Sequence, residues 1–190
     1  MTSHYLVVDL EATCCDQRSI PRSQTEIIEI GAVMVKTGSW KALDEFQAFV
    51  KPKLHPRLTD FCLELTGITQ AQVDGGRPFS EVLQALVEWA EGFPDYLFCS
   101  WGNYDKHQFD QDCTQHGLAM PFANHCNLKG AFAAQRGLRR GVGMKGALGM
   151  CGLELKGQHH RGIDDARNIA RLVPYALGLT DPCAGSAAGP

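Results

Sequence analysis

The chain has 190 residues, 44% of them hydrophobic and 21% charged, which is ordinary for a single soluble globular domain. The formal net charge of −3 argues against a general nucleic-acid coating protein, but allows an acidic cluster that holds divalent cations. No apolar run reaches transmembrane length and no signal peptide is visible, so we expect no membrane association. The eight cysteines lack zinc-binding spacing, which indicates reduced thiols in a cytoplasmic protein.

Three strands are predicted at the start of the chain. Residues 4–10 form a nearly continuous apolar run, which is typical of a strand buried on both faces. Residues 26–36 and 41–50 have the composition and alternation of two further strands, and the segment 37–40 between them signals a turn. We therefore expect an antiparallel meander.

Helices and short strands alternate after the meander. The clearest helix begins after Pro78 and ends at Gly92, because apolar residues recur between them with helical spacing. Thr69 starts a capping-box sequence, which predicts a short helix from Gln70. The other expected elements are helices at 58–65, 104–116, 128–136, 145–151 and 164–177, and strands at 96–100 and 123–127.

This order of elements predicts an α/β fold in which helices flank a mixed sheet. Residues 1–180 are expected to form one domain. Residues 181–190 are rich in Ala, Gly and Pro, and we expect them to be a disordered tail. Pro174 lies in the last predicted helix and is expected to kink or shorten it.

Two carboxylates, Asp9 and Glu11, come at the end of the first predicted strand. Side chains at this spacing point to the same face of a strand, where two negative charges repel each other. Such a pair favours a bound cation, and its hard oxygen ligands suit Mg²⁺ or Mn²⁺. The alternative is a strand end whose carboxylates are merely solvated.

Two later segments have the chemistry to join this pair. Asp105 follows a predicted strand in the first turn of a helix, the end of a sheet where ligands gather, although it could simply favour the helix dipole. His160 lies in a glycine-containing loop, and Asp165 follows it in the first turn of the last helix. This arrangement suits a proton-accepting histidine beside a rigid ligand, whereas a solvated loop is the alternative.

These residues together resemble the DEDDh exonucleases of the RNase T and proofreading-exonuclease superfamily. The pattern is Asp9-x-Glu11, then Asp105, then His160-x4-Asp165. The resemblance implies an RNase H-like mixed sheet of five strands in the order 3-2-1-4-5, with the first three antiparallel. The chain is most similar to the histone-mRNA and small-RNA 3′-exonuclease branch, through residues 8–14 (VDLEATC), 26–32 (EIIEIGA), 100–102 (SWG) and 163–170 (IDDARNIA).

The resemblance also implies a catalytic role for each of these residues, with two Mg²⁺ or Mn²⁺ ions as cofactors. Asp9, Glu11 and Asp165 would hold one ion. Asp9 and the substrate phosphate would hold the second, with Asp105 acting directly or through water. His160 would take the proton of the attacking water; His159 is the competitor, but it lacks the H-x4-D spacing.

One segment is a candidate for contact with the last nucleotide of a substrate. Thr66-Gly67-Ile68 resembles the family segment that packs against the terminal nucleotide. The glycine would allow close approach of the backbone, and Ile68 would wedge against the base. The alternative is an ordinary glycine turn before a capped helix.

Three further residues are candidates for substrate contact near the predicted metal site. Trp101 is a candidate for stacking on a base, although a core position is equally compatible with the sequence. The backbones of Leu10 and Ala12 are candidates for contact with the terminal ribose hydroxyls. Such contacts are where RNA can be distinguished from DNA.

Basic residues gather in two segments despite the acidic total. Lys51, Lys53 and Arg57 form the first group. We predict that the second group follows the phosphates of the bound strand, although such a run can also be a solvated surface. This second group comprises Arg136, Arg139, Arg140 and Lys145.

The sequence thus predicts a metal-dependent 3′→5′ exonuclease that releases nucleoside 5′-monophosphates from single-stranded RNA. A DNA 3′-exonuclease of the proofreading or repair type is the first alternative. A nucleic-acid-binding module without catalysis is the second, and it is disfavoured because all five catalytic positions are filled.

Overall fold

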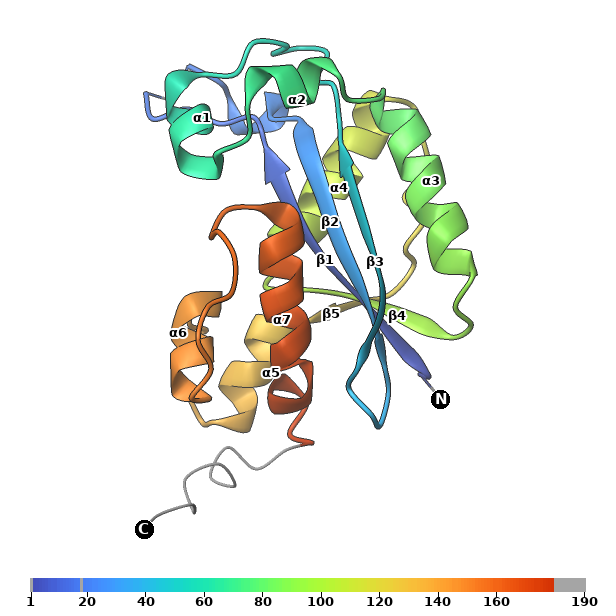
Figure 1. Cartoon of the computed structure of the whole chain (residues 1–190), viewed down its shortest axis with the longest axis vertical. Coiled ribbons are helices and arrows are strands. Elements are labelled where there is room, and N and C mark those ends of the chain that lie inside the picture. The colour runs from blue at the N-terminus through green and yellow to red at the C-terminus, as the bar shows by residue number, and fades with distance from the viewer. Residues whose placement is uncertain (1, 18, 180–190) are drawn as a thin grey trace.

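The computed structural model describes residues 2–17 and 19–179, with a five-stranded mixed sheet at the centre (Figure 1). The strand order is β3-β2-β1-β4-β5, as predicted. The strands β1, β2 and β3 pair antiparallel, whereas β4 is parallel to both β1 and β5. The bounds are β1 (His4–Ala12), β2 (Ile27–Lys36), β3 (Ala42–Phe49), β4 (Tyr96–Ser100) and β5 (His125–Asn127).

The central strand β1 is apolar on both faces because a helical layer covers each face. Leu6 and Val8 lie in one buried cluster and Val7 lies in another. β1 extends two residues beyond its predicted end, because Glu11 and Ala12 still pair with β2 across a register shift. Glu11 therefore lies within the strand rather than after it.

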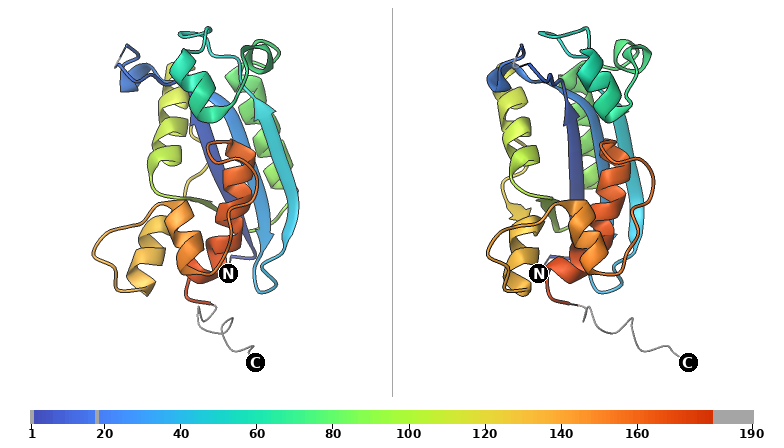
Figure 2. Two further views of the ribbon diagram at one scale, coloured as in Figure 1. Left: turned by 60° about the vertical axis from the view of Figure 1, so that its left-hand side comes forward. Right: turned by 90° about the vertical axis from the view of Figure 1, so that its left-hand side faces the viewer.

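The two helical layers are visible on either side of the sheet (Figure 2). One layer contains α3 (Phe79–Glu91) and α4 (Tyr104–Gln115), whose apolar residues share a cluster with β1 and β2. The other layer contains α5 (Leu128–Gln135), α6 (Met144–Met150) and α7 (Gly162–Ala176). The predicted helices of the second half are therefore confirmed.

Two short helices, α1 (Asp60–Thr66) and α2 (Gln70–Asp74), lie beyond the carboxyl end of β1 (Figure 1). A small buried cluster joins them to Ile28 of β2. The predicted capping box is present, because the side chains of Thr69 and Gln72 exchange hydrogen bonds with each other's backbone N–H groups. The helices α1 and α2 therefore cover the carboxyl end of β1.

Several predicted boundaries shift in the structure. α7 begins at Gly162, two residues earlier than expected, and Pro174 lies inside it without ending it. A short 3₁₀ helix (Arg22–Gln24) lies between β1 and β2, where no helix was predicted. The predicted tail at 181–190 lies outside the described residues, and a single domain over 1–180 stays a prediction. No helix in the described part of the chain is long and apolar enough to cross a membrane.

Candidate active site

A pocket of about 360 Å³ opens beside the carboxyl end of β1. Its walls come from β1, α1, the start of α4, the start of α6 and the loop before α7. A second pocket, of about 430 Å³, is lined by Tyr96, Phe122 and their neighbours and brings no group of carboxylates together. We assign the site to the first pocket, whose lining includes Asp9, Glu11, Asp105, His160 and Asp165.

Three of these carboxylates, from Asp9, Glu11 and Asp165, form a compact group. β1 presents Asp9 and Glu11, and the first turn of α7 supplies Asp165. One oxygen from each lies within 4.8 Å of the other two, close enough for one ion to be held by all three. These are hard oxygen donors, which suit Mg²⁺ or Mn²⁺ rather than a softer metal.

The protonation equilibria of these carboxylates reflect the same crowding. Burial, followed by repulsion from Asp105, Glu11 and Asp165, holds the pKa of Asp9 well above its usual range. Burial and repulsion from Asp165 raise the pKa of Glu11 to about 8. Burial also raises the pKa of Asp165. A bound divalent cation would relieve this repulsion, so the donor set fits such an ion.

A fourth carboxylate, that of Asp105, reaches the same pocket from α4. It lies in the first turn of α4, and its Oδ1 accepts a hydrogen bond of 3.0 Å from the backbone N–H of Leu10. Burial raises its pKa to about 6, although hydrogen bonds from Leu10, its own backbone and Ser100 oppose the shift. One Asp105 oxygen is thus tied to β1 between Asp9 and Glu11.

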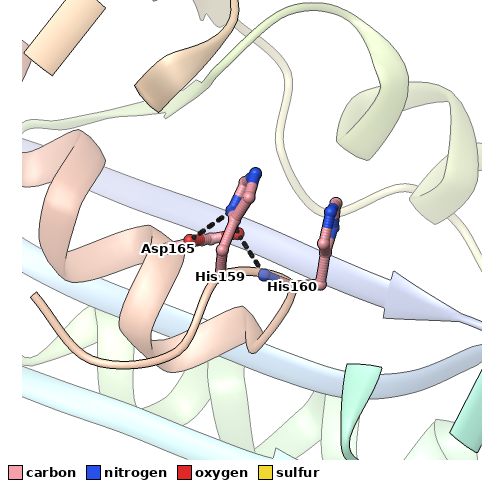
Figure 3. Close-up of side chains that lie close together, drawn as sticks. All are labelled: His159, His160 and Asp165. Carbon is pink, nitrogen blue, oxygen red and sulfur yellow. Dashed lines mark hydrogen bonds and ion pairs between the residues drawn. The ribbon is translucent and has the colours of Figure 1, made fainter. Parts of the chain in front are cut away.

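Two adjacent histidines reach the pocket from the loop before α7 (Figure 3). The Nδ1 of His159 lies 2.9 Å from Oδ2 of Asp165, and the backbone N–H of His160 donates to the same oxygen over 2.9 Å. The two rings are stacked, with centroids 4.0 Å apart. His160 has a φ of 65°, a conformation that is uncommon for a non-glycine residue and often marks a functional site.

The basicity of His160 fits proton acceptance at neutral pH. Burial and the neighbouring His159 lower its pKa, and Asp165 opposes this shift only in part. The imidazole is therefore neutral at pH 7 and has a lone pair available. His159 differs in that its Nδ1 is bonded to Asp165.

The structure contradicts the predicted wedge at Ile68. This side chain has no exposed surface and packs in the core cluster with Cys62 and Val73. Thr66 is equally buried, and its hydroxyl donates to the carbonyl of Cys62. The glycine turn explains the motif: Gly67 ends α1 in the left-handed conformation that glycine favours.

Part of the pocket wall comes from residues that the sequence did not single out. Leu65 of α1 lines the pocket, one residue before the predicted motif. Helical periodicity could have found it, because Leu65 lies three residues after buried Cys62. The other lining residues without a predicted role are Cys14, Tyr104, Gly143 and Met144.

The sequence left open whether Trp101 stacks on a base or lies in the core, and the structure is compatible with both. Its Nε1 donates to the carbonyl of Val142 over 3.0 Å and its ring packs against Phe132, yet it also lines the pocket. Leu10 and Ala12 line the pocket as well. The N–H of Leu10 already donates to Asp105, so this group is not free for a ribose hydroxyl.

The structure gives Arg136, a predicted phosphate contact, partners within the protein. Its guanidinium donates to the carbonyl of Tyr175 and to Sγ of Cys151, and it lies 3.8 Å from the ring centroid of Phe132. Arg136 therefore joins α5 to the end of α7. The remaining predicted basic residues, Arg139, Arg140, Lys145, Lys51, Lys53 and Arg57, are exposed, and Lys145 directly follows the pocket residue Met144.

The chain matches the family described as Exonuclease (RNase_T) over residues 6–173. It belongs to this exonuclease family. Its five-stranded sheet is the RNase H-like sheet of DEDDh nucleases, and its relatives place it in the histone-mRNA and small-RNA 3′-exonuclease branch.

Three relatives illustrate this membership of the exonuclease family. ERI1 exoribonuclease 2 of Homo sapiens is 34% identical over 193 residues, which cover 90% of this chain and 28% of that protein. The nuclease domain of 3′hExo, a DEDDh family member solved with rAMP, superposes with a TM-score of 0.86 at 30% identity, covering 93% of this chain and 92% of that one. A 3′-exonuclease solved for its recognition of the histone mRNA stem-loop gives 0.83 at 28%, covering 93% and 64%. The chain thus spans under a third of that human exoribonuclease.

Proposed function

We propose that this chain is a metal-dependent 3′→5′ exonuclease that removes nucleoside 5′-monophosphates from the ends of single-stranded RNA. The observation that carries the proposal is the meeting of carboxylates from three distant segments beside His160 in one pocket. Crowding raises the pKa values of Asp9 and Glu11, so the group is poised for a cation rather than for solvent.

Each residue of the site has a distinct part in this proposal. Asp9, Glu11 and Asp165 would hold one divalent ion, and Asp9, with Asp105 directly or through water, would help to hold a second. When bound, two such ions supply charge neutralisation and an activated water for in-line attack on phosphorus. His160, neutral at pH 7, accepts the proton of that water at a ring nitrogen.

The pocket suits the single nucleotide at a strand end. Its volume of about 360 Å³ lies at the small end of ligand pockets. Leu65 and Trp101 offer apolar surface for a base, and Ala12 brings backbone close to the carboxylates. The 3′-oxygen of the preceding nucleotide would be the leaving group, which makes the terminal nucleotide a 5′-monophosphate.

RNA is preferred over DNA in this proposal because the relatives support it. One relative is named an exoribonuclease, another was solved with rAMP, and a third was solved for recognition of an RNA stem-loop. The alternative, a DNA exonuclease, has no comparable support from these three proteins. A cytoplasmic location is also a proposal, which fractionation of cells with an antibody against the chain would test.

A degradation ladder tests the function directly. We expect RNA labelled at its 5′ end to shorten one nucleotide at a time with Mg²⁺ and to stay intact with EDTA. RNA labelled at its 3′ end should release a labelled mononucleotide at once. Shortening from the 5′ end, or products of internal cleavage, would contradict the proposal.

A further inference from the structure

A carboxylate without a catalytic role, that of Glu29 on β2, is buried beside the active site. Its side chain has no exposed surface. Glu29 is the register partner of Glu11 on β1, so the two side chains lie on the same face of the sheet. Repulsion from Glu29 is also one of the contributions that raise the pKa of Glu11.

The hydrogen-bond donors to the Glu29 carboxylate come mostly from Arg161 and Gly162, at the end of the loop that carries His160 and the start of α7. Nε and Nη2 of Arg161 donate to the two carboxylate oxygens over 3.1 and 3.2 Å. The backbone N–H of Gly162 donates to Oε2 over 2.9 Å, and Nε2 of Gln47 donates to Oε1 over 2.6 Å. Such a two-pronged contact fixes orientation as well as distance.

The two-pronged contact of Arg161 with Glu29, here called the fork, is made by a residue that lies in the sequence between His160 and Asp165. Arg161 directly follows His160, and Asp165 lies in the first turn of α7, the helix that Arg161 caps. The start of α7 contacts the strands without a side chain between them, because a Cβ on Gly162 would lie 3.1 Å from the carbonyl oxygen of Asp9. Glu29 thus bonds to the start of α7 at the point where this helix meets β1.

We propose that Glu29 and Arg161 are a positioning pair that sets the spacing between the strand-borne and helix-borne halves of the metal site. One half is Asp9 and Glu11 on β1; the other is His160 and Asp165 at α7. This inference rests on the proposed function for its kinetic consequences, but its effect on cation affinity can be measured separately.

For the variant Arg161→Gln, electrostatics and positioning predict opposite changes in cation affinity. Arg161→Gln removes a positive charge beside the carboxylates, so charge alone predicts tighter cation binding. Loss of positioning predicts weaker binding. The double variant Glu29→Gln/Arg161→Gln leaves the net charge unchanged and avoids an unpaired buried carboxylate, so it isolates positioning.

A matched control exists on the same helix. Arg167 of α7 and Glu45 of β3 form an ion pair of 2.6 Å, with side chains 47% and 38% exposed. This pair also joins α7 to the sheet, but it lies away from the pocket lining. The control is Glu45→Gln/Arg167→Gln, which is likewise neutral in net charge.

The experiment is a calorimetric titration of each full-length variant with Mn²⁺, together with RNA cleavage kinetics. We expect Glu29→Gln/Arg161→Gln to bind Mn²⁺ about 10-fold or more weakly and to lose about 10–100-fold in kcat with little change in KM, the range typical of residues that orient metal ligands. The control should match the wild type in both. If wild-type protein binds Mn²⁺ without cleaving RNA, the proposed function fails while the titration still decides the positioning role.

Two results would overturn the positioning role. One is an unchanged Mn²⁺ affinity and kcat in Glu29→Gln/Arg161→Gln; the other is an equal loss in the control pair. Arg161→Lys decides the question if the double variant does not fold, because it keeps the charge and loses the fork. We expect several-fold weaker Mn²⁺ binding in that variant, and wild-type affinity would count against the pair.

Discussion

Asp105 accepts a hydrogen bond of 3.0 Å from the backbone N–H of Leu10, although the two residues are 95 positions apart in the sequence. Leu10 lies between Asp9 and Glu11 on β1, so this bond fastens the fourth carboxylate to the strand that presents the first two. Backbone hydrogen bonds to a carboxylate favour its charged form. They partly offset the burial that raises the pKa of Asp105 to about 6.

The crowded carboxylates predict an unusual dependence of stability on pH in the metal-free protein. The pKa of Glu11 is about 8 in the folded chain against 4.5 ordinarily. Between these values the folded chain holds a proton that the unfolded chain has released, so stability is fully present below 4.5 and is lost as the pH rises through 8. Melting curves in EDTA should show Tm falling across this range.

The control for this prediction is Glu11→Gln, which cannot titrate and removes one charge from the group. Its Tm in EDTA should decline less and should exceed that of the wild type near the top of the range. Adding Mg²⁺ to the wild type should restore Tm, because a ligand that binds only the folded state stabilises it. A Tm in EDTA that rises between these pH values would contradict the account.

Substitution of His160 should lower kcat more than substitution of His159. His160→Asn removes the proposed base, and kcat should fall by about 10²–10⁴-fold. His159→Asn removes a contact to Asp165 and should cost about 10-fold. Single-turnover cleavage of labelled RNA measures both losses. Equal losses would contradict the assignment of the base to His160, and a larger loss in His159→Asn would assign it to His159.

The close contact between β2 and α7 predicts a severe effect at Gly31. A Cβ at this position would overlap the backbone of Gly162 and Ile163, so Gly31→Ala should push α7 away from the carboxylates. We expect the free energy of unfolding to fall by about 1–3 kcal/mol or more, together with a large loss of kcat. Gly149→Ala is the control, because nothing lies within 4 Å of its Cβ. Wild-type cleavage by Gly31→Ala would refute this close packing.

Removing the charge of Arg136 should affect stability, whereas removing the charge of Lys145 should affect RNA binding. Arg136→Gln breaks contacts to Tyr175 and Phe132, so denaturant melts should show reduced stability while KM for RNA stays unchanged. Lys145→Gln should raise KM and reduce the slope of log affinity against log salt by about 1, if this exposed lysine contacts a phosphate. An unchanged salt slope would remove Lys145 from the substrate path.

The sequence predicts much of the fold because its local signals agree with one another. The meander, the capping box at Thr69 and the periodic helix after Pro78 each depend on neighbouring residues. The five candidate catalytic residues could be named because they match the order and spacing of the DEDDh exonuclease motifs, and their residue types suit metal and acid–base chemistry. The structure then brings them to one pocket.

Other features depend on which way a side chain faces after packing, and spacing does not reveal that. Ile68 beside a glycine could face a cleft or the core, and it faces the core. Arg136 lies in a basic segment, yet Phe132 and the end of α7 hold it. Glu29 lies in an apolar strand, and only the pairing with β1 and the return of the chain at Arg161 give it a place beside the site.

The most direct test of the proposed function compares wild-type protein with Asp165→Asn on one RNA and one DNA oligonucleotide of matched sequence, each with Mg²⁺ and with EDTA. The account predicts stepwise 3′→5′ shortening of RNA by the wild type with Mg²⁺ only, slower cleavage of DNA, and no shortening by the folded variant. Undiminished cleavage by Asp165→Asn, or cleavage that persists in EDTA, would contradict it.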